Sequence, residues 1–397
     1  MNKLYIIGFG PGDEALLTCK AKDTLKATQR ILGTGRIGDS GERVLKLSLT
    51  ELVAELKNPA EGETAVLVSG DCGFFSMAKT LISDFSNLYE IEVIPGISSI
   101  QYFSAKLKIP YDDAVFISLH GRNGYIVPKV AYNKKVFTLT GGANSTREIC
   151  RTLCRYGLSN VCVSVGERLS HPKERIIIAK AAELQNVDFD ELTVLYIENP
   201  SAVNPHTPLA DREFIRGDVP MTKEEIRWLS IQKLGISPTD IVYDIGAGTG
   251  SVSVEMARKS FEGFVYAIEK NKEACDLIRK NITKHGAFNI ELIHGEVPPA
   301  FDKLPVPDKA FIGGSSGSMD GILERLISNN PNIKIVVNAI TLQTLNQVTE
   351  CFDKYSLTDV EIICVNIAKS KRVNSYDMMT AQNPVFIISG KGGGNYA

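Results

Sequence analysis

A short run of glycines follows an acidic residue in the second half of the chain, in the order Asp244-Ile245-Gly246-Ala247-Gly248-Thr249-Gly250. The apolar residues before it predict a strand over 241–245, and a helix is expected to begin at Ser251. Glycines at such a turn let a ligand approach the backbone closely, beside the N-terminus of the helix. Glu269 ends the next expected strand, where its carboxylate could accept hydrogen bonds from both hydroxyls of a ribose. The pattern therefore predicts a nucleotide-like cofactor.

The spacing of these glycines favours one cofactor over another. It is Gly-x-Gly-x-Gly, and Ser251 stands where the dinucleotide pattern Gly-x-Gly-x-x-Gly has its third glycine. Asp244 lies two residues before the first glycine, where its carboxylate could orient the loop or reach the ammonium group of a methionine. This set resembles the class I methyltransferases, which bind S-adenosylmethionine (SAM). A nicotinamide-dependent oxidoreductase is the rival interpretation, and the missing third glycine counts against it.

Further runs on either side make this resemblance more specific. Together with the glycine loop, 219–223, 295–298 and 311–315 are similar to the decarboxylating C15-methyltransferases of corrin (vitamin B12) synthesis, over about residues 210–397. The resemblance implies a Rossmann-like class I fold, with Val297 acting through its backbone near the adenine. The SAM-binding residues expected in this half are Thr222, Asp244, Gly246, Ala247, Gly248, Thr249, Gly250, Glu269 and Val297.

Glycine-rich turns also follow five expected strands in the first half of the chain. Glycine at five strand ends indicates one long cleft where the backbone meets a ligand. Pro11 argues against a dinucleotide loop at the first turn, because proline lacks the N–H that a phosphate would need. The runs begin at Gly8, Ser69, Pro95, Ser118 and Thr140.

The order and sequence of these turns are similar to the tetrapyrrole methylases, and specifically to their C5-methyltransferase branch, over about residues 1–200. That family has two α/β lobes with SAM between them and is unrelated to the class I methyltransferases. His120 and Arg122 would face the tetrapyrrole, although a structural role suits His120 equally well. The implied SAM contacts are Gly10, Pro11, Gly12, Gly70, Asp71, Gly73, Ser98 and Ser99.

Strands and amphipathic helices alternate along the whole chain, so the expected fold class is α/β. We expect a tetrapyrrole methylase domain over 1–200, with lobes of about 1–110 and 114–200. A linker over 201–220 is rich in proline, and a class I domain follows over 221–397. That domain should begin with the helix Met221–Leu234, opened by the capping box Thr222-Lys223-Glu224-Glu225.

Composition restricts the partners of the protein. The net charge of −2 leaves no basic excess for a nucleic acid or an anionic membrane, so no such partner is expected. No apolar run reaches the length of a spanning helix, and the N-terminus has no secretory pattern, which predicts a cytoplasmic protein. Eight scattered cysteines give no zinc pattern, and no metal is expected. Self-association as a homo-oligomer is expected from the two families.

Two methylase halves in this order resemble the bifunctional, decarboxylating C5,15-methyltransferases, whose substrate is an anionic precorrin or cobalt-precorrin. The resemblance implies two SAM sites per chain, methylation at C5 and C15, and loss of CO2 from the ring-C acetate chain. Lys223 belongs to a local basic cluster that could position substrate carboxylates, although a solvated surface is the favoured explanation for any single residue of the cluster. Two alternatives stay open: a methylase of another tetrapyrrole, or one catalytic half fused to a SAM-binding regulatory half.

Overall fold

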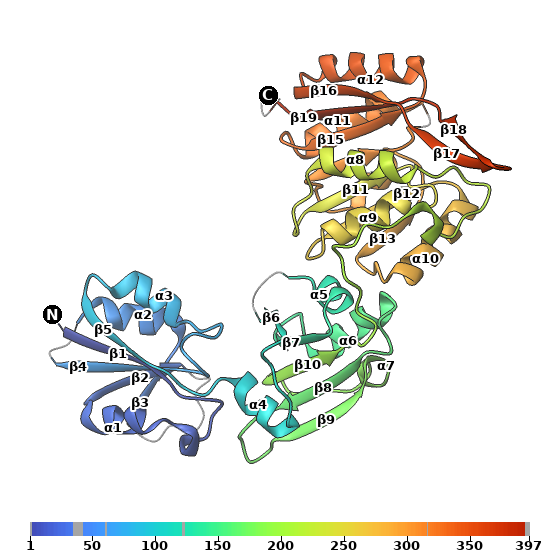
Figure 1. Ribbon diagram of the computed structural model, residues 1–397. Coiled ribbons are helices and arrows are strands. Elements are labelled where there is room, and N and C mark those ends of the chain that lie inside the picture. Colours follow the sequence, from blue (N-terminus) through green and yellow to red (C-terminus); the bar gives the residue numbers. More distant parts are fainter. Residues whose placement is uncertain (1, 35–42, 60–61, 121–123, 316, 394–397) are drawn as a thin grey trace. The chain divides into compact units, whose positions relative to one another are not determined.

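The computed structural model describes residues 2–34, 43–59, 62–120, 124–315 and 317–393 (Figure 1). The chain divides into two compact units, both built from β-sheets and α-helices, as the sequence predicted. No helix among these residues is long and apolar enough to cross a bilayer. The first unit comprises Met1–Gly124, Lys135–Cys154 and Ser159–Glu198, and the second comprises Tyr125–Lys134, Arg155–Leu158 and Asn199–Ala397.

The first sheet of the first unit is entirely parallel. The helices α2 (Leu49–Lys57) and α3 (Ala78–Phe85) share a core with one face, and α1 (Cys19–Ala27) packs into the core of the other. Because all strands run the same way, their carboxyl ends meet at one edge. In the order β3-β2-β4-β1-β5 the strands are Val44–Leu47, Arg30–Thr34, Glu63–Val68, Asn2–Gly8 and Tyr89–Ile94.

The second sheet of this unit is mixed, because only β6 and β7 are parallel neighbours. The helix α4 (Ser99–Leu107) packs against this sheet, with Ile100 and Phe103 in the same core cluster as Phe137 and Tyr196. In the order β6-β7-β10-β8-β9 the strands are Val115–Ser118, Lys135–Leu139, Thr193–Glu198, Cys162–Glu167 and Arg175–Lys180. The shorter elements nearby are α6 (Thr146–Arg155) and α7 (Ala181–Leu184).

The second unit is built on a seven-stranded sheet of order β13-β12-β11-β14-β15-β19-β16. The first five strands are parallel, and the last two are antiparallel additions. In sheet order the strands are Ile290–His294, Phe264–Glu269, Ile241–Ile245, Lys309–Ile312, Lys334–Ala339, Val385–Lys391 and Thr358–Val365.

Five main helices complete this sheet. The first three, α8 (Glu224–Leu234), α9 (Ser251–Lys259) and α10 (Lys272–His285), bury apolar residues in one shared cluster with β11 and β12. The other two, α11 (Met319–Asn329) and α12 (Leu342–Lys354), pack against each other.

The start of α8 differs from the sequence prediction. The helix begins at Glu224 with Lys223 as its N-cap, and no side chain caps it, so the predicted capping box was wrong. Thr222 precedes the helix, and its carbonyl accepts a hydrogen bond of 2.9 Å from Arg227.

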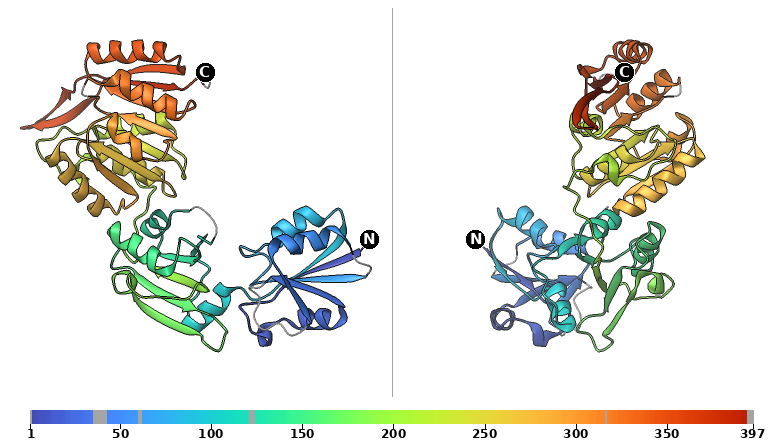
Figure 2. Two further views of the ribbon diagram at one scale, coloured as in Figure 1. Left: turned by 180° about the vertical axis from the view of Figure 1, so that it is seen from behind. Right: turned by 45° about the vertical axis from the view of Figure 1, so that its right-hand side comes forward.

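A hairpin between β16 and β19 was not expected from the sequence. Strands β17 (Ala368–Val373) and β18 (Tyr376–Ala381) form a two-stranded sheet of their own. Figures 1 and 2 show it extending away from the other elements of the second unit. An isolated two-stranded hairpin is only marginally stable in water, so its contacts at the stem matter.

The residues predicted as a linker pack onto the second unit. Leu209 and Phe214 are buried in its core, and a single fully buried guanidinium, that of Arg227, ties them to α8. Arg227 donates to the carbonyl of Leu209 at 2.7 Å and to Asp211 at 3.0 Å, and its guanidinium lies over the ring of Phe214. The sequence of this segment does not indicate that it packs onto the second unit, because two isolated apolar residues show no periodicity.

Replacing Arg227 should therefore destabilise the second unit. We expect Arg227→Met to lower the free energy of unfolding by about 3 kcal/mol, because it leaves Asp211 without its buried partner. Arg216→Met is the matched control: Arg216 lies 3.5 Å from the same carboxylate but is half exposed, so we expect a loss below about 1 kcal/mol. Urea unfolding followed by the fluorescence of Trp228, the one tryptophan, reports this unit alone. Equal losses would contradict the prediction.

Candidate SAM site and its counterpart in the first unit

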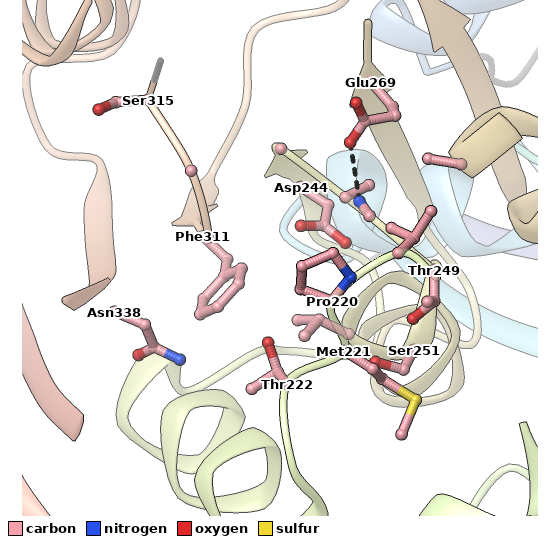
Figure 3. A pocket seen from close by; sticks show the side chains of 18 of the residues that line it. Pro220, Met221, Thr222, Asp244, Thr249, Ser251, Glu269, Phe311, Ser315 and Asn338 are labelled. Atoms are coloured by element: carbon pink, nitrogen blue, oxygen red, sulfur yellow. Dashed lines mark hydrogen bonds between the residues drawn. The ribbon is translucent and has the colours of Figure 1, made fainter. Parts of the chain in front are cut away.

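A cavity of about 830 Å³ lies at the carboxyl edge of the seven-stranded sheet (Figure 3). Its volume is in the range of small-molecule sites. The ends of the five parallel strands, the turn before α8 and the stem of the β17–β18 hairpin form its walls. Residues far apart in the sequence meet here because parallel strands end at the same edge. The predicted residues that line it are Thr222, Lys223, Asp244, Gly246, Ala247, Gly248, Thr249, Glu269 and Val297.

Each glycine of the loop after β11 is required for a different structural reason. Gly246 has φ +74°, and a Cβ there would lie 2.6 Å from the carbonyl oxygen of Gly314, so the ends of β11 and β14 touch through their backbones. Gly248 also has a positive φ, of +57°. Gly250 faces α10, where a Cβ would lie 3.1 Å from Ile278. Gly250 therefore permits α9 and α10 to pack together. Its position in the glycine motif alone could not distinguish this structural role from contact with a cofactor.

Glu269 is fixed at the cavity wall by two backbone hydrogen bonds. Its Oε2 accepts from the N–H of Gly248 at 2.9 Å, the bond drawn in Figure 3, and its Oε1 accepts from the N–H of Asn271 at 2.9 Å. Each carboxylate oxygen can accept a further bond. The last residue of β12 thus presents a fixed hydrogen-bond acceptor to the cavity.

Asp244 carries a buried negative group without a cationic partner among the described residues. Its side chain is fully buried, and the hydroxyl of Ser253 donates to Oδ2, whereas Oδ1 has no hydrogen-bond partner within the described chain. Burial raises the pKa of Asp244 to about 7, with a smaller contribution from the charge of Glu269, and the bond from Ser253 opposes the rise. An unpartnered carboxylate oxygen at a cavity wall fits the ammonium or sulfonium of SAM.

On the side of the cavity that faces Glu269, the sequence analysis named Phe311 within the run 311–315 but missed Asn338. Figure 3 shows Asn338 and Phe311 there, from the ends of β15 and β14. Three strand spacings separate β12 from β15, which places Asn338 about 14 Å along the sheet from Glu269. Its Nδ2 is buried with no partner among the described residues, and Ser230 Oγ lies 3.0 Å from its Oδ1. Its place at the end of a parallel strand was a signal that could have found it.

The first unit brings its predicted glycines together at the carboxyl ends of β1, β4 and β5. Gly10 and Gly70 exchange two backbone hydrogen bonds, of 3.1 and 2.9 Å. A Cβ on Gly8 would lie 2.5 Å from the nitrogen of Gly96, and one on Gly96 would lie 2.4 Å from the oxygen of Gly8. These strand ends therefore admit no side chain between them.

Asp71 joins two of these turns. Its Oδ2 accepts from the N–H of Gly73 at 2.8 Å, and its Oδ1 accepts from the N–H of Gly96 at 3.2 Å. Ser98 caps α4 in a capping box with Gln101, so its hydroxyl already has a structural role. The predicted neighbours Pro11, Gly12 and Ser99 lie in the first turn and at the start of α4.

Two histidines of the first unit pack against glycines. The Nδ1 of His120 lies 3.1 Å from the carbonyl oxygen of Thr140, and the ring lies against Gly141. His171, which the sequence analysis did not select, places its ring against Gly12. Arg122 lies outside the described residues. No cluster of metal-ligating side chains occurs among the residues that the structure describes.

Because the carboxyl of Asp244 is buried, replacing it should raise the stability of the unit and lower its affinity for SAM. Its folded pKa of about 7 exceeds the unfolded value of about 3.9, so the unfolding free energy of the ligand-free unit falls as pH rises between these values. Asp244→Asn should remove this decline, stabilise the unit at pH 8, and weaken SAM binding at least about tenfold. Urea unfolding at pH 5 and 8 and SAM calorimetry test this. An unchanged pH dependence would contradict it.

A matched pair of glycines tests the loop geometry. Gly246→Ala should lower the unfolding free energy by about 1–2 kcal/mol or more and abolish SAM binding, because its φ is positive and its Cβ meets Gly314. Gly314→Ala should leave the unfolding midpoint unchanged, since φ is ordinary there and no atom lies within 4 Å of the added Cβ. Loss of stability in both variants would refute this account.

Two families of known proteins match the two halves of the chain. The model of the tetrapyrrole (corrin/porphyrin) methylases matches residues 3–185, and the precorrin methyltransferase domain matches residues 213–391. A Methanococcus vannielii protein named "Probable cobalt-precorrin-6B C(15)-methyltransferase (decarboxylating)" is 38% identical over 185 residues, covering 46% of this chain and 99% of the relative. A Sinorhizobium protein named precorrin-6Y C(5,15)-methyltransferase (decarboxylating) is 28% identical over 351 residues, covering 87% of this chain and 82% of the relative.

A solved structure is similar to one half only. The crystal structure named precorrin-6Y C5,15-methyltransferase from Geobacter metallireducens is 36% identical, covers 46% of this chain and 96% of its own, and has a TM-score of 0.44. The names of both relatives describe decarboxylating methyltransferases that act on precorrins. The chain belongs to the precorrin methyltransferase family and joins a tetrapyrrole methylase half to a decarboxylating methyltransferase half.

Proposed function

We propose that the chain methylates a precorrin or cobalt-precorrin at C5 and C15 and removes CO2 from the ring-C acetate chain, in cobalamin biosynthesis. The first unit would carry the C5 step, and the second unit the C15 step with the loss of CO2. The cavity that gathers Asp244, Glu269 and the glycine loop carries this proposal. The Sinorhizobium relative, which spans both halves, supports the pairing of the two steps in one chain.

We assign one SAM site to each half, and therefore two per chain. The tetrapyrrole methylase domain would comprise 1–200, with lobes of about 1–110 and 114–200, and the class I domain 221–397, joined by the docked segment 201–220. The first site would use Gly10, Pro11, Gly12, Gly70, Asp71, Gly73, Ser98 and Ser99. The second would use Thr222, Asp244, Gly246, Ala247, Gly248, Thr249, Glu269 and Val297, with Gly250 holding the loop against α10.

Positioning is the main task of the protein in this chemistry. Bound SAM supplies a methyl group that is already activated on a sulfonium, so much of the rate depends on alignment with a carbon of the macrocycle. Glu269 would bind the ribose, and ionised Asp244 would pair with the cationic end. The substrate carbon would then lie toward Phe311 and Asn338, on the far wall of the cavity.

Decarboxylation needs an acceptor for an electron pair rather than a strong base. The bond between the acetate methylene and its carboxylate breaks, its electron pair enters the conjugated macrocycle, CO2 leaves, and a proton from water completes the methyl group that remains on ring C. The cavity wall near Asn338 includes the apolar side chains of Phe311, Ile340 and Val385, which would desolvate the carboxylate. CO2 loss and C15 methylation would be coupled in this pocket, because the first enriches the ring in electrons for the second.

Charged side chains and free thiols support the proposed substrate contacts and cellular location. Lys223 at the second cavity, and His120 and Arg122 in the first unit, would position the carboxylates of the macrocycle. All eight cysteines are free, which supports a reducing cytoplasm. We propose a homo-oligomer that uses no nucleic acid or membrane, and sedimentation of the purified chain tests its assembly.

Single-site variants of the full chain separate the two activities. Asp71→Ala should abolish the C5 methylation, because Asp71 joins two turns of the first site, and should leave C15 methylation and CO2 loss intact. Glu269→Ala should have the reverse effect. Mass spectrometry of products from a precorrin substrate measures both, and the unaltered chain should add two methyl groups and remove one CO2.

Two results would contradict the proposal. One is loss of both methylations in either variant while both units remain folded. The other is calorimetry that finds a single SAM site per chain, which would instead favour a regulatory role for one half.

A further inference from the structure

The β17–β18 hairpin has two faces of different character. Its cross-strand pairs alternate sides, so every second pair lies on the same face. Ile367 and Gln382 line the cavity, and one face of the hairpin lies on the same side of the ladder as these two residues. We call it the pocket face. It carries Lys369, Lys371, Val373, Tyr376, Met378 and Thr380, whereas the outer face carries Ala368, Ser370, Arg372, Asp377, Met379 and Ala381.

The stem of the hairpin is anchored at the cavity. Lys369 lies 3.1 Å from Glu224 and 2.6 Å from Glu225, at the start of α8. The N–H of Gln382 donates to the carbonyl of Ile367 at 2.8 Å, which closes the ladder at its base. The pocket face therefore runs outward from the cavity without a break.

Beyond this anchor the pocket face is exposed and amphipathic. Tyr376 and Met378 are 73% and 57% exposed, and Val373 is exposed beside them. Lys371 has no ion-pair partner among the described residues, whereas Arg372 on the outer face pairs with Asp377 at 3.0 Å. At about 3.3 Å per residue, the exposed part extends about 7 to 13 Å beyond Lys369. A flat apolar surface beside an unpaired cation results.

We propose that the pocket face of the hairpin binds the tetrapyrrole substrate of the second site. This inference rests on the proposed function, because it assumes a macrocycle with apolar ring faces and several carboxylates. Tyr376, Met378 and Val373 contact the ring, and Lys371 binds a carboxylate at its edge. The continuity of this face with the cavity, and its charge opposite to that of the substrate, support this occupant.

Two adjacent methionines provide a matched test. Met378→Glu and Met379→Glu add the same charge at neighbouring exposed positions, 57% and 66% exposed, on opposite faces. In the full chain, Met378→Glu should raise KM for the tetrapyrrole in CO2 release at least about tenfold, because a carboxylate then meets the anionic substrate. Met379→Glu should change it less than about twofold. Lys371→Gln should raise it in the same direction.

Several readouts separate substrate binding from other effects. The affinity for SAM, the C5 methylation rate and the Trp228 unfolding midpoint should be unchanged in all three variants. Equal effects of the two methionine variants, or no effect of either, would overturn the proposal. So would a change in sedimentation with an unchanged KM, which would assign this face to contact between copies of the chain. Failure of the unaltered chain to release CO2 would instead refute the proposed function itself.

Discussion

Direct contact between backbones at the ends of parallel strands is the constraint on which both halves depend. In the first unit Gly8 and Gly96 meet with no room for a side chain, and in the second Gly246 meets Gly314. Two different folds thus share one feature: at the edge where several strands end, no side chain separates the neighbouring main chains. Glycine is required there for space as much as for conformational freedom.

Electrostatics then distinguishes the second site from an ordinary cleft. Asp244 is held at the end of the central strand without a cation, and its burial opposes ionisation. The cationic ligand proposed for this site would relieve this cost, and part of the stability of the folded protein would then be exchanged for affinity. Glu269, by contrast, is satisfied by backbone donors and needs no ligand to remain in place.

Sequence patterns predicted the features that depend on short stretches of the chain. They missed the features that depend on contacts between distant residues. The loop after β11 and Glu269 follow from spacing along the chain, and both line the cavity. The start of α8 lies at Glu224 instead of Met221, and the buried side chain of Arg227 ties this end of the helix to the carbonyl of Leu209, far outside any capping motif. Asn338 was missed because it belongs to no glycine motif. The β17–β18 hairpin was missed because its residues are exposed on both faces and show no simple alternation of apolar and polar side chains.

The turn of that hairpin has a consequence for how the sequence can change over evolutionary time. Two residues, Asn374 and Ser375, join the strands, and Asn374 adopts a positive φ of +53°, as tight hairpin turns require. Inserting or deleting one residue within a strand would turn every later side chain to the opposite face. Substitutions along the hairpin alter one contact at a time, but a change of length would invert Met378 and Met379 together. The register of the hairpin therefore constrains the number of residues in this arm more strictly than most of their identities.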